Sequence, residues 1–126
     1  MRILFLDDDP DRHELMDRRH PLDEVIHVYD LDEYREALSK YDSFGMISLD
    51  HDLNDFTEVH KHRSYIGDSE GTGRDACGYL IKFLHKAPEE IIIHSSNEDG
   101  AVEMMLFLYS RGVASRRVVF NDSRDQ

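Results

Sequence analysis

Two carboxylates flank an imidazole in the segment "LDHDL", which spans Leu49 to Leu53 and follows the apolar run "FGMIS". A buried strand needs none of these polar groups, whereas a metal site or phosphate chemistry uses all three. Two further polar segments also follow an apolar run directly: the acids "DDD" at residues 7–9 and the set "HSSN" at residues 94–97. These three segments are therefore the candidates for a functional site.

The elements that must position these segments alternate along the chain. Apolar runs predict strands, and amphipathic segments between them predict helices. The strands are expected at residues 2–6, 24–30, 44–50, 90–96 and 116–120, and the helices at residues 10–19, 32–41, 73–86 and 98–112. Thr72 is the expected N-cap of the third helix, and Gly112 the expected C-cap of the fourth.

Strands that alternate with helices indicate an α/β fold with a parallel sheet between two helical layers. We predict a flavodoxin-like, receiver-like three-layer fold with five strands in the order 2-1-3-4-5. No final helix is predicted after the fifth strand. That edge is then open to a partner subunit, so a homodimer is possible.

The chain of 126 residues suits a single domain, residues 1–126. Residues 53–72 are polar and rich in histidine, and they predict an inserted loop beside the site. Residues 121–126 form a polar tail.

Composition excludes several classes of protein. The 27 acidic residues exceed the 15 lysines and arginines, and the net charge of −12 argues against binding along duplex nucleic acid. A small phosphorylated ligand, or an RNA end held through a metal, remains possible. No apolar run reaches the roughly 18 residues of a membrane span. The single cysteine, Cys77, and the acidic start of the chain lead us to expect a cytoplasmic protein.

The carboxyl ends of parallel strands share one edge of the sheet, where ligands bind in such folds. The three polar segments would bring five carboxylates and two imidazoles to that edge. Carboxylates at short range repel one another, so some must take up protons or a cation must bind. Oxygen ligands suit Mg²⁺ or Mn²⁺, and the imidazoles of His51 and His94 extend the choice to Zn²⁺ or Fe²⁺. The alternative is that these acids cap helices or lie solvated in loops.

Phosphate partners can also be proposed from residue type. Ser95 could donate to a phosphoryl oxygen or satisfy the backbone of a turn. Arg74 stands in the first turn of a helix, where a cation is unfavourable, which hints at a bound anion. Arg12 follows the first acidic segment, and His62 and Arg63 belong to the basic stretch of the predicted loop.

The placement of Asp7, Asp8 and Asp50 resembles the acidic pocket of response-regulator receiver domains, with Ser95 at the position of their Ser or Thr. In those domains two acids bind Mg²⁺ and the third is phosphorylated. Their lysine would fall near Asn121 or Asp122, and neither is basic.

The sequence is more similar to the cyclic-phosphate processing receiver domains. The motifs that carry this resemblance are "LDDDPDR" (6–12), "SLDHDL" (48–53), "TGRDACGYL" (72–80) and "IHSSNEDGAVEMM" (93–105). The resemblance implies a metal-dependent site that acts on cyclic phosphates, such as 2′,3′-cyclic RNA ends or cyclic nucleotides.

The resemblance also implies roles for individual residues. It implies Asp7, Asp8, Asp50 and Asp52 as metal ligands, His51 and His94 as ligands or an acid–base pair beside Asp50, and Ser95 and Asn97 as contacts to the phosphate.

Three functions follow as hypotheses. The first is a metal-dependent phosphoesterase, which would be an enzyme that hydrolyses a cyclic phosphate. The second is a binder without catalysis that sequesters a cyclic nucleotide or docks on a protein. The third is a receiver domain that accepts a phosphoryl group on Asp50.

Overall fold

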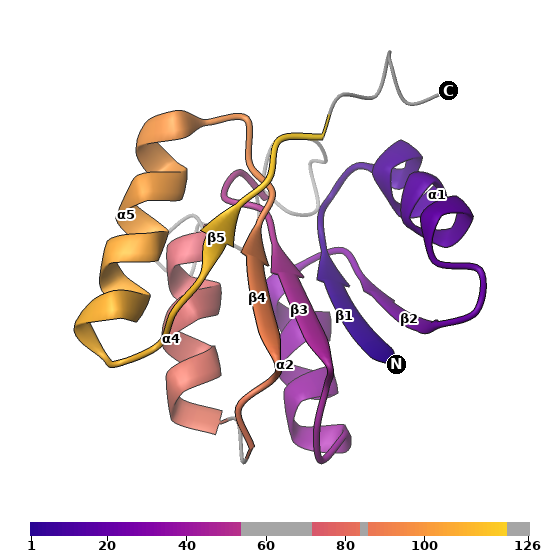
Figure 1. The fold of residues 1–126 in the computed structure, drawn as a ribbon, viewed down its shortest axis with the longest axis horizontal. Coiled ribbons are helices and arrows are strands. Elements are labelled where there is room, and N and C mark those ends of the chain that lie inside the picture. Colours follow the sequence, from indigo (N-terminus) through magenta and orange to yellow (C-terminus); the bar gives the residue numbers. More distant parts are fainter. Residues whose placement is uncertain (54–71, 84–85, 121–126) are drawn as a thin grey trace.

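Five parallel strands form one sheet in the order β2-β1-β3-β4-β5, as the sequence predicts. A computed structural model describes residues 1–53, 72–83 and 86–120 of the chain. The strands are β1 (Arg2–Leu6), β2 (Glu24–Val28), β3 (Met46–Leu49), β4 (Glu90–Ile93) and β5 (Arg116–Arg117) (Figure 1).

The helices within the described residues are α1 (Pro10–Arg19), α2 (Leu31–Lys40), α4 (Gly73–Phe83) and α5 (Glu98–Ser110). Side chains cap their first turns, because the first N–H groups of a helix have no partner inside it. The predicted cap at Thr72 is confirmed, because its hydroxyl accepts from the Arg74 amide at 3.2 Å. The C-cap of α5 is Arg111 and not Gly112 as predicted; Gly112, with φ of 81°, is the next residue.

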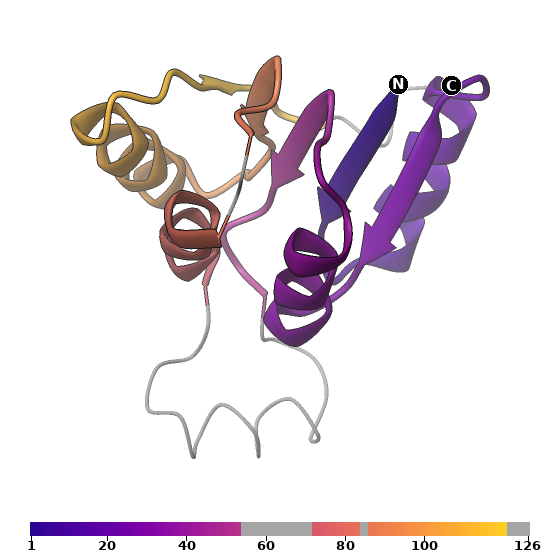
Figure 2. The same ribbon diagram turned by 90° about the horizontal axis from the view of Figure 1, so that it is seen from below.

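Helices cover both faces of the sheet (Figure 2), which explains why the central strands β1, β3 and β4 are largely apolar. The larger core packs one face of the sheet against α2, α4 and α5; it includes Leu4, Leu6, Ile47, Ile93 and Met104. The smaller core lies on the face that carries α1 and consists of Ile3, Phe5, Met16, Met46 and Ile92.

No helix follows β5 in the described part of the chain, as predicted. β5 is shorter than expected, two residues instead of residues 116–120. Beyond it the backbone keeps one bond to β4, from the Val118 amide to the Ile93 carbonyl at 2.9 Å. Val118 and Phe120 then pack against the smaller core. This segment thus covers part of the face that α1 leaves open.

Among the described helices, none is long and apolar enough to cross a membrane.

Candidate metal and phosphate site

Three carboxylates meet at the carboxyl edge of the sheet. Asp7 and Asp8 directly follow β1, and Asp50 directly follows the neighbouring β3. One oxygen of each carboxylate lies within 4.8 Å of the others. Asp7 and Asp50 are buried, and Asp8 is partly buried. The structure therefore brings together three of the four predicted metal ligands.

Asp7 is held by a buried histidine. His94 Nε2 lies 2.9 Å from Asp7 Oδ2, and His94 Nδ1 lies 2.7 Å from Ser48 Oγ. An ionised carboxylate can only accept, so Nε2 carries the proton and Ser48 donates to Nδ1. The imidazole stacks on Phe5 and on Phe120, with ring centroids 4.6 and 5.0 Å away. Both ring nitrogens of His94 are thus engaged inside the protein.

These contacts set the charge of the pair. Burial lowers the pKa of His94 more than its hydrogen bond to Asp7 raises it, so the ring is neutral. Burial acts to raise the pKa of Asp7, but the hydrogen bond from His94 and the amide of Asp9 outweigh it, and the pKa is lowered. Asp7 is therefore an anion that is oriented by a neutral imidazole.

Asp50 differs from Asp7 in its protonation. Burial, followed by the negative charge of Asp7, raises the pKa of Asp50 to about 7. The amide of His51, which donates to Asp50 Oδ1 at 2.8 Å, offsets only part of this shift. A cation among the three carboxylates would relieve this repulsion, and the donor set of oxygens fits a hard divalent ion.

Arg12 lies beside these carboxylates, as its place in the sequence suggests. Its Nη1 is 3.5 Å from Asp7 Oδ2, and its Nε is 4.0 Å from Asp9 Oδ2. The first turn of α1 carries it, because α1 begins directly after the acidic segment. A phosphate at this edge would find one fixed guanidinium next to the carboxylates.

The fourth predicted ligand belongs to a different group. Asp52 Oδ1 lies 2.8 Å from His51 Nδ1 and 3.4 Å from Asn97 Nδ2, at the start of α5. His51 Nε2 lies 3.9 Å from Glu103 Oε1. In the described residues Asp52 is therefore placed with His51 and Asn97 and is not among the three clustered carboxylates.

Ser95 and Asn97 satisfy backbone groups in this structure. Ser95 Oγ accepts from the Asn97 amide at 3.0 Å, and Asn97 Oδ1 accepts from the Gly100 amide at 2.9 Å as the N-cap of α5. Of the two roles considered for Ser95, the structure contains the turn contact.

Sequence reasoning missed Arg117, whose Nη2 donates to the Ser95 carbonyl at 3.1 Å. Its only signal was a basic residue in the last predicted strand.

Arg74 lies against an aromatic ring in this structure, and anion binding at this residue stays a prediction. Its guanidinium lies 4.3 Å from the centre of the Phe107 ring, so the side chain is part of the contact between α4 and α5. A cation–π contact with α5 explains why a cation is tolerated in the first turn of α4. His62 and Arg63 lie outside the described residues.

Two aromatic residues beside Asp7 were also missed. His13 Nε2 donates to the Asp7 carbonyl at 2.7 Å, and the His13 ring stacks on Tyr29 with centroids 3.9 Å apart. His13 falls in the predicted helix 10–19, and Tyr29 falls in the predicted strand 24–30, which the structure ends at Val28. No sequence pattern indicated that they lie next to the carboxylates.

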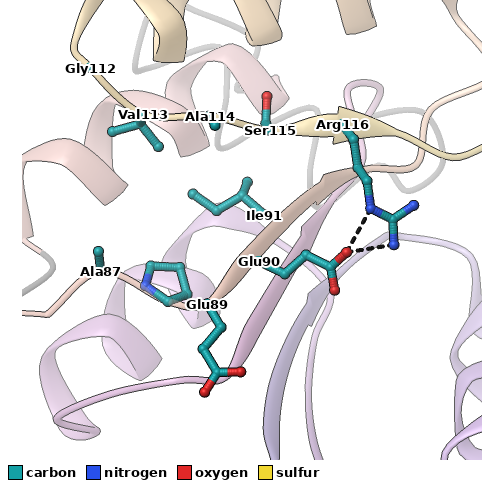
Figure 3. Close-up of a pocket in the computed structure, with 10 residues that line it drawn as sticks. Ala87, Glu89, Glu90, Ile91, Gly112, Val113, Ala114, Ser115 and Arg116 are labelled. Carbon is teal, nitrogen blue, oxygen red and sulfur yellow. Dashed lines mark hydrogen bonds and ion pairs between the residues drawn. The ribbon is translucent and has the colours of Figure 1, made fainter.

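A pocket lies at the opposite edge of the sheet (Figure 3). It is lined by the start of β4 and by the residues that lead into β5, including an ion pair between Arg116 and Glu90 at 2.6 Å. Since parallel strands all run the same way, this pocket is at their amino ends. It is distinct from the site formed by the three carboxylates.

The sheet order and the acids at the ends of β1 and β3 define a receiver-like α/β domain. The family model of the cyclic-phosphate processing receiver domain matches residues 2–110, so the chain belongs to that family. No curated protein matches the sequence.

Solved structures confirm the fold. A response regulator protein from Burkholderia pseudomallei, with a phosphorylated aspartic acid, calcium ion and citrate, has a TM-score of 0.65 at 14% identity. The match covers 92% of this chain and 58% of that one. The response regulator TrrA from Thermotoga maritima, in complex with Mg²⁺-BeF, has a TM-score of 0.62 at 18% identity and covers 98% and 90% of the two chains.

A third structure, described as an adenylate cyclase from Rhodopirellula baltica, has a TM-score of 0.67 at 18% identity, with 94% of this chain and 74% of that chain covered.

Proposed function

We propose that this domain is a metal-dependent phosphoesterase that hydrolyses a cyclic phosphate, either a 2′,3′-cyclic RNA end or a cyclic nucleotide. The observation that carries the proposal is the cluster of Asp7, Asp8 and Asp50 with Arg12 beside it. The family description supports the cyclic phosphate as substrate. The ligand is then small or single-stranded, in keeping with a net charge of −12.

The donor atoms favour Mg²⁺ or Mn²⁺ as the metal. Asp7, Asp8 and Asp50 offer oxygen, whereas both nitrogens of His94 and Nδ1 of His51 already have partners. Zn²⁺ and Fe²⁺ would gain from nitrogen ligands and are therefore less well supported. When bound, a divalent cation supplies positive charge that stabilises the phosphoryl oxygens as the ester is cleaved.

Three side chains would bind the phosphate, position a metal ligand and transfer a proton. Arg12 would bind the phosphate, because a guanidinium pairs well with phosphate oxygens. His94 would be a positioning residue that holds Asp7, since it is buried with both nitrogens engaged. His51 is the better candidate for proton transfer, because its ring is less buried and Asp52 holds its Nδ1.

A direct assay tests this proposal. Metal-stripped protein is incubated with 2′,3′-cyclic mononucleotides, a cyclic-ended oligonucleotide, 3′,5′-cyclic nucleotides or cyclic dinucleotides, with Mg²⁺, Mn²⁺ or Zn²⁺ added singly. Phosphorus NMR should record opening of one class of ring with Mg²⁺ or Mn²⁺. Asp50→Asn and Asp8→Asn should each lose most of this rate, and the exposed Asp42→Asn should retain it.

Two results would count against the enzyme. Rates like those of the original protein in both Asp50→Asn and Asp8→Asn would show that the carboxylates are not the site. Ligand resonances that broaden without any turnover would favour the binder that sequesters its ligand.

A second candidate function is phosphoryl transfer to Asp50. It is favoured by the position of Asp50 beside Asp7 and Asp8, and by the phosphorylated aspartic acid in the similar response regulator from Burkholderia pseudomallei. Incubation with acetyl phosphate and Mg²⁺, followed by mass spectrometry, would reveal an acyl phosphate on Asp50. Its absence in the original protein would exclude this function.

A further inference from the structure

An aromatic residue, Tyr29, follows the strand next to β1 at the same edge of the sheet as the three carboxylates. Tyr29 directly follows β2, and the Asp7 amide donates to the carbonyl of the preceding Val28 at 3.2 Å. Neighbouring strands are spaced by about 4.8 Å, so the backbone of Tyr29 lies one strand away from that of Asp7. A ligand that contacts both residues would therefore extend from the end of β1 to the end of the neighbouring β2.

The ring of Tyr29 is held rigidly on one side. His13 stacks against it with centroids 3.9 Å apart and planes at 25°. His13 is itself buried, donates to the Asp7 carbonyl, and contacts the Phe5 ring edge-on at 4.8 Å. The Tyr29 amide donates to Glu33 Oε1 at 2.7 Å, which fixes the backbone. The orientation of Tyr29 is therefore tied to that of the metal-site residue Asp7.

Tyr29 also keeps accessible surface. The residue is 36% exposed although His13 is stacked on it. Two acids lie near its hydroxyl, since burial and then the charges of Glu33 and Asp17 raise the pKa of Tyr29. Negative surroundings disfavour a second phosphate at this place and accept an uncharged aromatic ring.

We infer that the site takes a nucleoside cyclic monophosphate, with its phosphate at the carboxylates and Arg12 and its base stacked on Tyr29. This inference rests on the proposed function and specifies its substrate class. Aromatic stacking tolerates every base, because each base has a π-face. The platform therefore selects for the presence of a base more than for its identity.

The test compares a substrate that has a base with one that lacks it, in proteins with and without the aromatic ring at position 29. Adenosine 2′,3′-cyclic phosphate and the base-free methyl riboside 2′,3′-cyclic phosphate are hydrolysed in Mg²⁺ by the original protein and by Tyr29→Leu and Tyr29→Phe. The adenosine compound should have a kcat/KM at least about fivefold higher. Tyr29→Leu should lose this preference and Tyr29→Phe should keep it. Tyr109→Leu, an exposed tyrosine on α5, is the control.

A second measurement does not depend on turnover. Binding of adenosine 3′-monophosphate, measured by calorimetry, should weaken at least about fivefold in Tyr29→Leu and hold in Tyr29→Phe. Equal hydrolysis of both substrates, unchanged in Tyr29→Leu, would overturn the platform and leave the phosphoesterase standing. If neither substrate is hydrolysed, the proposed phosphoesterase activity is refuted, and the binding measurement still tests the stacking of the base on Tyr29. Weaker binding in Tyr29→Leu would support this stacking, and absent or unchanged binding would overturn it.

Discussion

At the scale of single residues, the site is shaped by two buried carboxylates with opposite shifts in pKa. Asp7 receives hydrogen bonds from His94 and from a backbone amide, and these keep it ionised. Burial, followed by the charge of Asp7, raises the pKa of Asp50 to about 7, and within the described residues one backbone amide donates to its side chain. Because both groups are similarly buried, the difference follows from the hydrogen bonds to Asp7 and from the repulsion of Asp50 by the charge of Asp7.

The shift of Asp50 predicts how stability depends on pH in the metal-free protein. The pKa is about 7 when folded and near 3.9 when unfolded, so folding favours the protonated acid. Its contribution to stability is present below about pH 4 and is lost as pH rises through 7. Asn cannot ionise, so Asp50→Asn should be more stable than the original protein at pH 8, by about 1–3 kcal/mol.

Thermal unfolding in EDTA between pH 5 and 8 checks this expectation. The two melting temperatures should diverge as pH rises, and Asp42→Asn should follow the original protein. Added Mg²⁺ should raise the melting temperature of the original protein and have little effect on Asp50→Asn. A variant that is less stable than the original at pH 8 without metal would contradict the role given to Asp50.

Substitution of the buried His94 should lower the affinity of the site for a metal ion. His94→Gln removes the ring between Ser48 and Asp7 and releases the Asp7 carboxylate. Partners that orient a metal ligand are typically worth about 10–100-fold in affinity. Calorimetry with Mg²⁺ should show a loss of that size. His20→Gln, which affects a pair with Asp23 away from the site, is the control, and equal affinity in both variants would show that His94 has no positioning role.

At the scale of elements, two glycines let α4 and α5 approach the loop after β3. A Cβ at Gly73 would lie 2.2 Å from the Asp50 carbonyl oxygen and 2.8 Å from His51 Cα. A Cβ at Gly100 would lie 2.6 Å from the ring of His51. The position of Asp50 therefore depends on two helices having no side chain at these points.

Substitution of these glycines tests the close packing. Gly73→Ala forces backbone atoms apart and should destabilise the domain by about 2–3 kcal/mol. Gly78→Ala is the matched control, because it lies in α4 with nothing within 4 Å of its Cβ position. That variant should gain up to about 1 kcal/mol from helix propensity. Urea unfolding measures both, and equal stabilities would refute the close approach of α4.

At the scale of the whole molecule, the segment after β5 completes the layer that contains α1. Phe120 stacks on His94 and Phe5, with centroids 5.0 and 5.9 Å away. It thereby closes the smaller core above the histidine that holds Asp7. Residues far apart in the sequence, at the end of β1 and at Phe120, therefore both contribute to the surroundings of Asp7.

Removal of this ring should weaken the fold and the site together. Phe120→Ala should lower the free energy of unfolding by about 1–3 kcal/mol, less than for a fully buried phenylalanine. It should also weaken Mg²⁺ binding, because water would reach His94. Val119→Ala changes a neighbour that is 52% exposed and should be nearly neutral. A Phe120→Ala protein as stable as Val119→Ala would show that the segment after β5 does not support the core.

Much of this architecture follows from the sequence because local signals and topology agree. Apolar runs at β1, β3 and β4 require burial on both faces, which calls for a parallel sheet between helices. Acids directly after β1 and β3 must then share one edge, so Asp7, Asp8 and Asp50 were predictable as a group. The cap at Thr72 and the turn at Gly112 were predictable because their chemistry is local, although the C-cap itself is Arg111.

Tertiary structure decided where side chains point once each strand ends. Asp52 joins His51 and Asn97 because the loop after β3 turns toward α5, and strand alternation no longer applies there. His94 is enclosed by Phe120, a residue far along the chain. Tyr29 comes to stand beside Asp7 through His13 on α1. Such contacts join residues distant in sequence, so the residue order determines which groups reach the edge of the sheet, and packing determines which of them face one another.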